Sequence, residues 1–453
     1  MDIAALGLSN LSDALSKGTV GAVEAARFYL DRIAVRNKTL NAFITVTDKL
    51  AYKQAEESDT RRVNGNTLGP LDGIPLALKD NIDLAGIPTT GGIQAYRNSV
   101  PDRDSEVVRR LREAGAVFLG KLNLHEGAHG ATTANHAFGY CQNPHKLGYT
   151  PGGSSGGSGS ALAAGLCAGA LGTDTLGSVR IPASFCGIVG LKPTYGLVST
   201  RGVMPLAYAL DHVGPMARST ADIALLLNGI AGFDPGDPSG RHGFKGFSVA
   251  QVEAKPIRTH KIGYFKKLHG IAGNTIAPEV ASAYNRAIEL LRHSGAQLEV
   301  VSWDSYDTAL VRPKALLLIE ADLANIHSDK LKSNPEGFTS EFRSSIAFGR
   351  EQNAPKLAKA MRMIEEVRPI ARHLFSKVDA LITPTTPIPS FPFDDEMPKT
   401  ITTYTAFANY AGCPALSVPM GLTKDSLPLG LQIITPKREE MTALQIGRIF
   451  ENA

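Results

Sequence analysis

The chain has 453 residues, 47 lysines and arginines, 43 aspartates and glutamates, and a formal net charge of +4. Because the net charge is small and the basic residues form no long run, the composition does not indicate nucleic acid as the direct partner. The first residues lack the basic start and apolar core of a secretion signal, and no apolar run reaches about 20 residues. We therefore expect a cytoplasmic protein that does not enter a membrane.

Helix-then-strand units recur along the chain. Their predicted ranges are 104–114 with 116–119, 282–294 with 297–301, and 360–377 with 380–383. Such alternation predicts the α/β class, as an α/β/α sandwich whose central mixed, mostly parallel sheet is covered by helices. A stretch rich in glycine, proline and aspartate at 232–246 predicts a loop between a catalytic half and a second half.

The first candidate catalytic residue is Lys79, which ends the apolar, strand-like run Gly73–Lys79. Most lysines are surface charges. Burial of the run that carries this lysine lowers its pKa, and a neutral amine can accept a proton. Paired serine and lysine side chains are a known alternative to the serine, histidine and aspartate triad.

A competing motif follows at His125–His129, which matches the HExxH pattern of zinc peptidases. In that pattern two histidines one helical turn apart bind the metal, and the glutamate acts as the base. The extended form of the motif needs a glycine and a histidine where this chain has Thr132 and Asn135. Gly127 also weakens a helix at its centre. A zinc peptidase remains the alternative from another functional class.

Two glycine-flanked serines are the most informative feature of the chain. They are Ser154 in the run Gly152–Ser158 (GGSSGGS) and Ser178 in the run Gly172–Arg180 (GTDTLGSVR). Glycine lets a substrate approach the backbone closely. The first run has a linker-like composition, but the small apolar residues at 158–169 indicate a packed helical segment. Each serine needs a neighbouring base to become a nucleophile.

The four cysteines are scattered without CxxC spacing, at Cys141, Cys167, Cys186 and Cys413. This spacing favours reduced structural thiols over disulfides or a zinc site. Cys186 follows Ser178 closely enough to suggest a thiol nucleophile, but its apolar neighbours favour a buried, inert thiol.

Taken in order and spacing, these motifs resemble those of the amidase signature hydrolases, and the resemblance covers essentially the whole chain. Besides the lysine and the two serines, further matching runs lie at 120–123, 190–196, 211–215, 383–387 and 409–415. The resemblance implies that Ser178 is the nucleophile that accepts the acyl group. It implies that Ser154, which follows a cis peptide bond in relatives, relays a proton between Ser178 and Lys79. Lys79 is then the base in acylation.

The resemblance also assigns residues around the nucleophile. It implies an oxyanion hole made by the backbone N–H groups of Thr175, Leu176, Gly177 and Ser178. Asp174 and Arg180 are expected to hold the loop rather than to react. Relatives usually carry glycine or alanine in place of Leu176, so this departure bears on specificity more than on chemistry.

We therefore expect an amidohydrolase that cleaves a carboxylic amide, or a related carbamoyl or ureide C–N bond, through an acyl-enzyme on Ser178. The expected organisation is a single amidase domain over 1–453, with a catalytic signature core at 65–220 and a variable substrate-pocket region at 304–370. The expected partner is a small-molecule amide, no cofactor or metal is expected, and a second copy of the chain or a small accessory subunit is left open.

Two alternatives remain within the resemblance, and two remain outside it: the zinc peptidase named above and a non-catalytic scaffold. The first is the glutamine-hydrolysing A subunit of an aminoacyl-tRNA amidotransferase, ranked lower because residues 311–350 do not match that subunit's substrate segment. The second is a hydrolase of small ureides, because relatives of that kind resemble this chain in the run Asn135–His145 at least as well as the amidotransferase subunit does. A non-catalytic scaffold is disfavoured by the intact lysine and serines.

Overall fold

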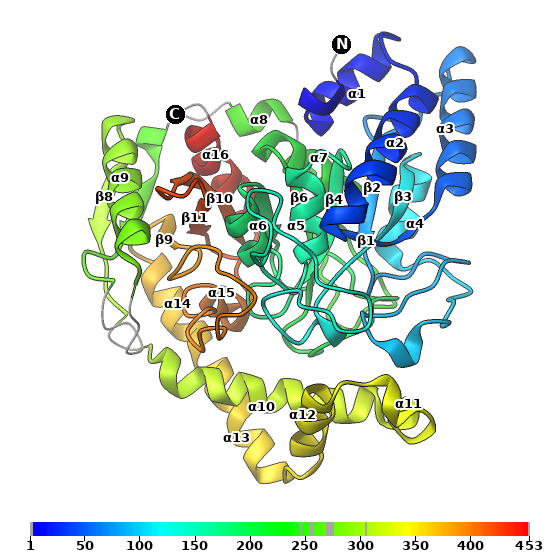
Figure 1. Ribbon diagram of the computed structural model, residues 1–453. Helices are drawn as coiled ribbons and strands as arrows, with labels where there is room; N and C mark the ends of the chain where they lie inside the picture. Colours follow the sequence, from blue (N-terminus) through cyan, green and yellow to red (C-terminus); the bar gives the residue numbers. More distant parts are fainter. Residues whose placement is uncertain are drawn as a thin grey trace.

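The chain folds around one large β-sheet, seen in the computed structural model in Figure 1. The structure describes residues 3–244, 246–247, 249–253, 257–268, 276–303 and 306–451. Within these residues, eleven strands pair in the order β1-β3-β2-β4-β6-β5-β10-β11-β9-β7-β8. Their bounds are β1 Phe43–Val46, β2 Pro75–Lys79, β3 Val117–Leu122, β4 Gly169–Asp174, β5 Val189–Lys192, β6 His212–Ala217, β7 Lys261–Tyr264, β8 Gln297–Val300, β9 Ala380–Pro384, β10 Ala415–Leu422 and β11 Pro428–Ile434.

The sheet is mixed, as expected. Its parallel pairs are confined to two groups, in which β2 pairs with β3 and β4, and β7 pairs with β8 and β9. The other pairings between the described strands are antiparallel, including β4 with β6 and β5 with β10. Parallel pairing is therefore limited to these two groups, and the sheet is less parallel than the helix-then-strand alternation predicts. The central strands β6, β5, β10 and β11 pair with antiparallel neighbours on both sides.

Helices cover the sheet, which confirms the predicted α/β/α architecture. Their bounds are α1 Leu8–Ser16, α2 Ala22–Leu40, α3 Asp48–Val63, α4 Glu106–Glu113, α5 Gly156–Ala163, α6 Arg180–Cys186, α7 Thr220–Ile230, α8 Val249–Glu253, α9 Pro278–His293, α10 Thr308–Ile326, α11 Ser328–Ser333, α12 Ser340–Arg350, α13 Ala354–Glu365, α14 Val367–Phe375, α15 Ala406–Ala411 and α16 Glu440–Glu451. Helices α10 to α13 lie together beside the sheet layers, at the bottom of Figure 1. No helix in the described ranges is long and apolar enough to cross a membrane.

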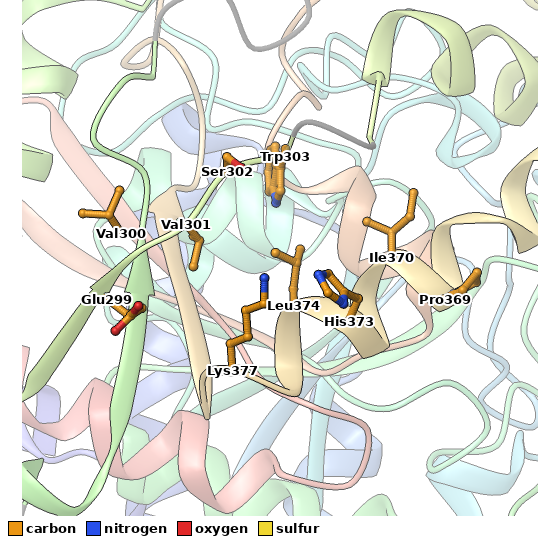
Figure 2. Close-up of a pocket in the computed structure, with 10 residues that line it drawn as sticks. All are labelled: Glu299, Val300, Val301, Ser302, Trp303, Pro369, Ile370, His373, Leu374 and Lys377. Carbon is orange, nitrogen blue, oxygen red and sulfur yellow. The ribbon is translucent and has the colours of Figure 1, made fainter.

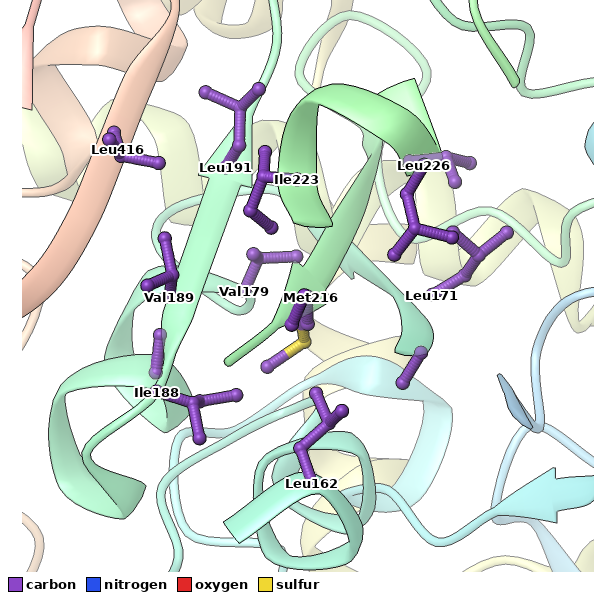
Figure 3. Packing of buried hydrophobic residues seen from close by; sticks show 14 of the residues in the cluster. Leu162, Leu171, Val179, Ile188, Val189, Leu191, Met216, Ile223, Leu226 and Leu416 are labelled. Atoms are coloured by element: carbon purple, nitrogen blue, oxygen red, sulfur yellow. The ribbon is translucent and has the colours of Figure 1, made fainter. Parts of the chain in front are cut away.

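The core lies on both faces of the central strands (Figure 3). Leu162 of α5 packs from one side and Ile223 of α7 from the other, with Met216 of β6 between them. All three side chains are fully buried. Burial on both faces explains why β2 and β4 carry buried residues at every position instead of alternating.

Most predicted elements are present with shifted ends. The helix expected at 104–114 is α4, and the helix expected at 282–294 is α9. The single helix expected at 360–377 is divided into α13 and α14 at Glu366. Pro369 explains the break, because it has no N–H to donate to the carbonyl of Glu365. The expected loop at 232–246 contains no helix or strand over 232–244, and residue 245 lies outside the described residues.

Candidate active site

Lys79 is positioned by the centre of the sheet. It is the last residue of β2, and parallel pairing with β4 brings its end beside the end of that strand. The side chain is completely buried, and its Nζ donates hydrogen bonds to Ser154 Oγ and Thr173 Oγ1, both at 2.7 Å. The carboxyl ends of parallel strands are a common place for ligand sites in α/β proteins.

Burial lowers the pKa of Lys79 from 10.5 to about 7, although the negative charges of Asp174 and Asp211 oppose this shift. The ammonium loses its hydration inside the protein, so the neutral amine is favoured. Near neutral pH this lysine therefore exists partly as an amine that can accept a proton. An ordinary surface lysine is almost entirely protonated at this pH.

Ser154 lies at the start of α5, after a cis peptide bond from Gly153. The glycines around it are packed tightly against the chain. A Cβ on Gly153 would lie 2.7 Å from backbone atoms of Ala131 and Thr132, and one on Gly157 would lie 2.4 Å from the carbonyl oxygen of Asn123. The run GGSSGGS is thus a close-packed segment and not a flexible linker.

Ser178 lies in the turn between β4 and α6, beside Ser154. The backbone N–H of Ser155 donates to the Ser178 carbonyl at 3.2 Å, which ties the two serine segments together. Lys79 and Ser154 are inaccessible, whereas Ser178 is partly exposed. Within the described chain, the Ser178 hydroxyl makes no hydrogen bond. Of the two predicted catalytic serines, Ser178 is therefore the one that a substrate can reach.

The loop that carries Ser178 is held by a buried ion pair. Arg180 donates to Asp174 through Nε at 3.0 Å and through Nη2 at 2.8 Å, and both side chains are fully buried. Asn409 Nδ2 also donates to Asp174 Oδ1, at 2.9 Å. Burial by itself raises the pKa of Asp174, but the charge and hydrogen bonds of Arg180 and Asn409 lower it by more, so the carboxylate is charged.

The same loop presents backbone donors next to the serine. The N–H groups of Thr175, Leu176 and Ser178 donate to no group in the described part of the chain. The N–H of Gly177, which the resemblance also assigns to an oxyanion hole, donates to Asp174 Oδ1 at 2.8 Å. Three donors of the predicted four are therefore free to bind a negatively charged oxygen. The side chain of Leu176 is buried in the main apolar core.

Two polar groups at this site were not singled out from the sequence. Thr173 is the second acceptor for Lys79. Asp211 accepts a 2.5 Å hydrogen bond from Thr175 Oγ1, and burial raises its pKa to about 6. A cavity of about 40 Å3 is lined by both Thr173 and Asp211. Asp211 belongs to one of the matching runs, and that match is the only sequence signal that marks it.

The HExxH segment does not form the helix that a zinc peptidase requires. It contains only the short 3-10 helix η3 (Glu126–Ala128), and Gly127 has a left-handed φ of 58°. The Glu126 carboxylate accepts hydrogen bonds from the backbone and hydroxyl of Thr339, while His125 Nδ1 lies 3.2 Å from Thr132 Oγ1. The two histidines therefore do not share a helix face, and the glutamate is engaged in a loop contact.

The cysteines are free and buried, as expected. Burial raises the pKa of the Cys186 thiol well above its usual value, which disfavours the nucleophilic thiolate. A separate hollow of about 500 Å3 appears in Figure 2, between α14 and residues 299–303. Trp303, His373 and Lys377 line it, and none of the predicted catalytic residues does.

Comparison with known proteins shows the family of this chain. A family model described as Amidase matches residues 24–444. The chain belongs to the amidase family. The chain is 37% identical to the A subunit of Glutamyl-tRNA(Gln) amidotransferase from Synechococcus sp. (strain CC9311), over 97% of this chain and 95% of that protein. It is also 37% identical to the protein of the same name from Carboxydothermus hydrogenoformans, over 100% and 98% of the two chains.

Solved structures give the same assignment. One is described as a vestigial protein complex that reveals the evolutionary origins of an s-triazine catabolic enzyme. It matches this chain with a TM-score of 0.92 at 33% identity, over 99% of this chain and 98% of that chain. The native peptide amidase from Stenotrophomonas maltophilia matches with a TM-score of 0.87 at 30% identity, over 100% and 97% of the two chains.

Proposed function

We propose that the chain is an amidohydrolase that cleaves a carboxamide through an acyl-enzyme on Ser178. The observation that carries this proposal is the buried contact between Lys79 and Ser154, next to an accessible Ser178. When Lys79 is neutral, the same contact lets the Ser154 hydroxyl donate to the amine. A serine whose proton can leave by this route is an activated nucleophile.

In the proposed acylation, Ser178 Oγ attacks the amide carbonyl carbon and passes its proton to Ser154, whose own proton goes to Lys79. The free N–H groups of Thr175, Leu176 and Ser178 hold the oxygen that becomes negative. Each preorganised donor of this kind contributes about 3 to 4 kcal/mol to catalysis. The proton then returns through Ser154 to the leaving nitrogen as the C–N bond breaks. Water hydrolyses the resulting ester and regenerates Ser178.

Asp174 and Arg180 act in this proposal by holding the loop. Their buried ion pair and the contact from Asn409 fix the turn between β4 and α6. Removal of one partner would leave an unpaired charge in the interior. The N–H donors would then lose the fixed positions on which their contribution depends.

For the substrate, the relatives favour glutamine over the general amide that the sequence suggested first. Curated relatives named as the A subunit of glutamyl-tRNA(Gln) amidotransferase match nearly the whole chain, so we propose glutamine as the first amide to test and a complex of several different chains as the working form. A small ureide is the second candidate, and it rests on the resemblance of the run Asn135–His145 to relatives that cleave such compounds. Cytoplasmic location and a single domain over 1–453 remain part of the proposal.

The proposal is tested by ammonia release from glutamine, neutral primary amides and small ureides. The wild type is compared with Ser178→Ala, and an acyl-enzyme is sought by intact-protein mass after rapid quenching. We expect release that the substitution abolishes and that a chelator leaves unchanged. Release that survives Ser178→Ala would refute the assignment of the nucleophile.

A further inference from the structure

Two hollows of similar size flank helix α14. The first is the hollow of about 500 Å3 in Figure 2, and the residues of this segment that line it are Pro369, Ile370, His373, Leu374 and Lys377. The second has a volume of about 520 Å3, and the residues of the same segment that line it are Arg368, Ala371, Arg372, Phe375 and Ser376. With 3.6 residues per turn, the two sets lie on opposite faces of the helix. Both volumes are in the range of small-molecule sites.

The two hollows differ in charge. Three cations line the second hollow, Arg368, Arg372 and Lys437, and no carboxylate of the described chain lines it. The hollow in Figure 2 is lined by Glu299 as well as by Lys377, so opposite charges partly cancel there. We call the second one the cationic hollow. A concave surface lined by charges of one sign concentrates the electrostatic potential and attracts ions of the other sign.

The two arginines of the cationic hollow have little to neutralise them. They lie one helical turn apart on α14, where like charges repel. Arg368 forms an ion pair with Glu365, at 3.7 Å between Nη1 and Oε1, but Glu365 does not line the hollow. The guanidinium of Arg372 forms no ion pair or hydrogen bond with the residues that the structure describes. All five of its N–H donors are therefore available to a ligand.

Lys437 reaches the cationic hollow from the other wall. It follows β11, and its side chain lies across the end of α15, where Gly412 has a left-handed φ of 67°. A Cβ on Gly412 would lie 3.2 Å from both Cε and Nζ of Lys437, so the glycine leaves room for the lysine. Partial burial lowers the pKa of Lys437, and the charges of Arg368 and Arg372 lower it further. An anion placed among the three cations would relieve this repulsion.

The rest of the lining suits the body of an organic ligand. Its apolar members are Ala371, Phe375, Ala411 and Pro436. Three convergent cations match a phosphate monoester better than a single carboxylate, because the phosphate carries a charge of about −1.5 to −2 at pH 7 and three acceptor oxygens.

We propose that the cationic hollow binds a phosphate monoester of a small molecule, with the phosphate among Arg368, Arg372 and Lys437 and the remainder of the ligand against the apolar walls. This inference goes beyond the proposed function and does not rest on it. None of the predicted catalytic residues lines the hollow.

Calorimetric titration of the whole chain tests the proposal with adenosine monophosphate, and with adenosine and inorganic phosphate as its two parts. We expect the monophosphate to bind more tightly than either part. Arg372→Met should weaken its binding at least about 10-fold, the effect of losing a hydrogen bond to a charged group. Arg372→Lys, which keeps the charge, should recover part of the loss. Lys377→Met is the matched control, since it removes a cation from the opposite face of the same segment, and it should bind as wild type does. Ser178→Ala should also bind as wild type does, whether or not any amide is cleaved.

Several results would overturn the phosphate site. They are adenosine binding as tight as that of the monophosphate, equal losses in Arg372→Met and Lys377→Met, unchanged binding in Arg372→Met, and no binding of either the monophosphate or inorganic phosphate. A short single-stranded RNA without terminal phosphates is the last probe. If it binds more tightly than the monophosphate and loses affinity in Arg372→Met, the small-molecule assignment is overturned in favour of a nucleic-acid surface. Thermal unfolding checks that each variant is folded.

Discussion

The pH dependence of the rate follows directly from the burial of Lys79. With a pKa of about 7, the neutral fraction of this lysine is about 9% at pH 6 and about 91% at pH 8. We therefore expect kcat/KM to rise about tenfold between these values and to level off above pH 8. A lysine with the ordinary pKa of 10.5 would be only about 0.3% neutral at pH 8, and the rate would keep rising to about pH 10.

The same burial predicts an effect on stability. The folded chain releases the Lys79 proton at about pH 7, whereas the unfolded chain holds it until about 10.5, so the unfolded state binds more protons between these values. The contribution of Lys79 to stability therefore increases as pH rises through this window. Between pH 7 and pH 10, three pH units at about 1.36 kcal/mol each give about 4 kcal/mol.

The variant Lys79→Met isolates this contribution, since it removes the titrating group and keeps the apolar stem. Its free energy of unfolding minus that of wild type should be larger at pH 6 than at pH 10 by about 4 kcal/mol, because only wild type gains stability as pH rises; urea unfolding measures both values. Its amidase activity should be lost. A wild-type rate that climbs tenfold per pH unit up to pH 10, or a variant that retains the wild-type rate, would refute the reasoning.

Three further predictions concern the loop and its neighbours, and a fourth concerns the zinc alternative. Ser178→Ala should lower ammonia release by more than about 10,000-fold with an unchanged Tm, because the hydroxyl makes no hydrogen bond within the described chain; a Tm lowered by several degrees would contradict this. Asp174→Ala should cost about 3 to 5 kcal/mol of unfolding free energy in urea, because it leaves the buried loop arginine unpaired; a cost below about 1 kcal/mol would speak against the ion pair as the support of the loop. Asp211→Asn should move the acid limb of the rate profile to lower pH, because the lost charge helps Lys79 keep its proton; an unmoved limb would show that this coupling is absent. Glu126→Gln should retain wild-type activity with or without a chelator, and a chelator-sensitive loss would return the zinc alternative.

Local sequence patterns predicted much of the fold. An apolar run ending in lysine predicted β2, and periodic apolar residues predicted α4 and α9. These predictions succeed because period and composition act within one element. The break at Glu366 between α13 and α14 was missed, since a proline near the start of a helix is compatible with continued helical periodicity. The extent of antiparallel pairing was also missed, because pairing depends on partners far apart in the chain.

For the candidate site, too, the sequence predicted some features and missed others. Motif order alone brought Lys79, Ser154 and Ser178 together as candidates, and it marked the GTDTLGSVR loop that follows β4. Nothing in the order of residues indicated that Lys79 would donate a hydrogen bond to Thr173 as well as to Ser154. The HExxH match likewise needed the observed left-handed Gly127 before a helix could be excluded.

By itself, the sequence determined the family of this protein and the residues that are candidates for its chemistry. It could do so because each glycine, serine or lysine motif is a short run that is recognised from its own residues. Only the tertiary structure decided which charges are buried and what they face. Arg180 is one arginine among many in the sequence, and it meets Asn409, 229 residues away, only in the folded chain. Burial lowers the pKa of Lys79, and burial is a property of packing and not of residue order.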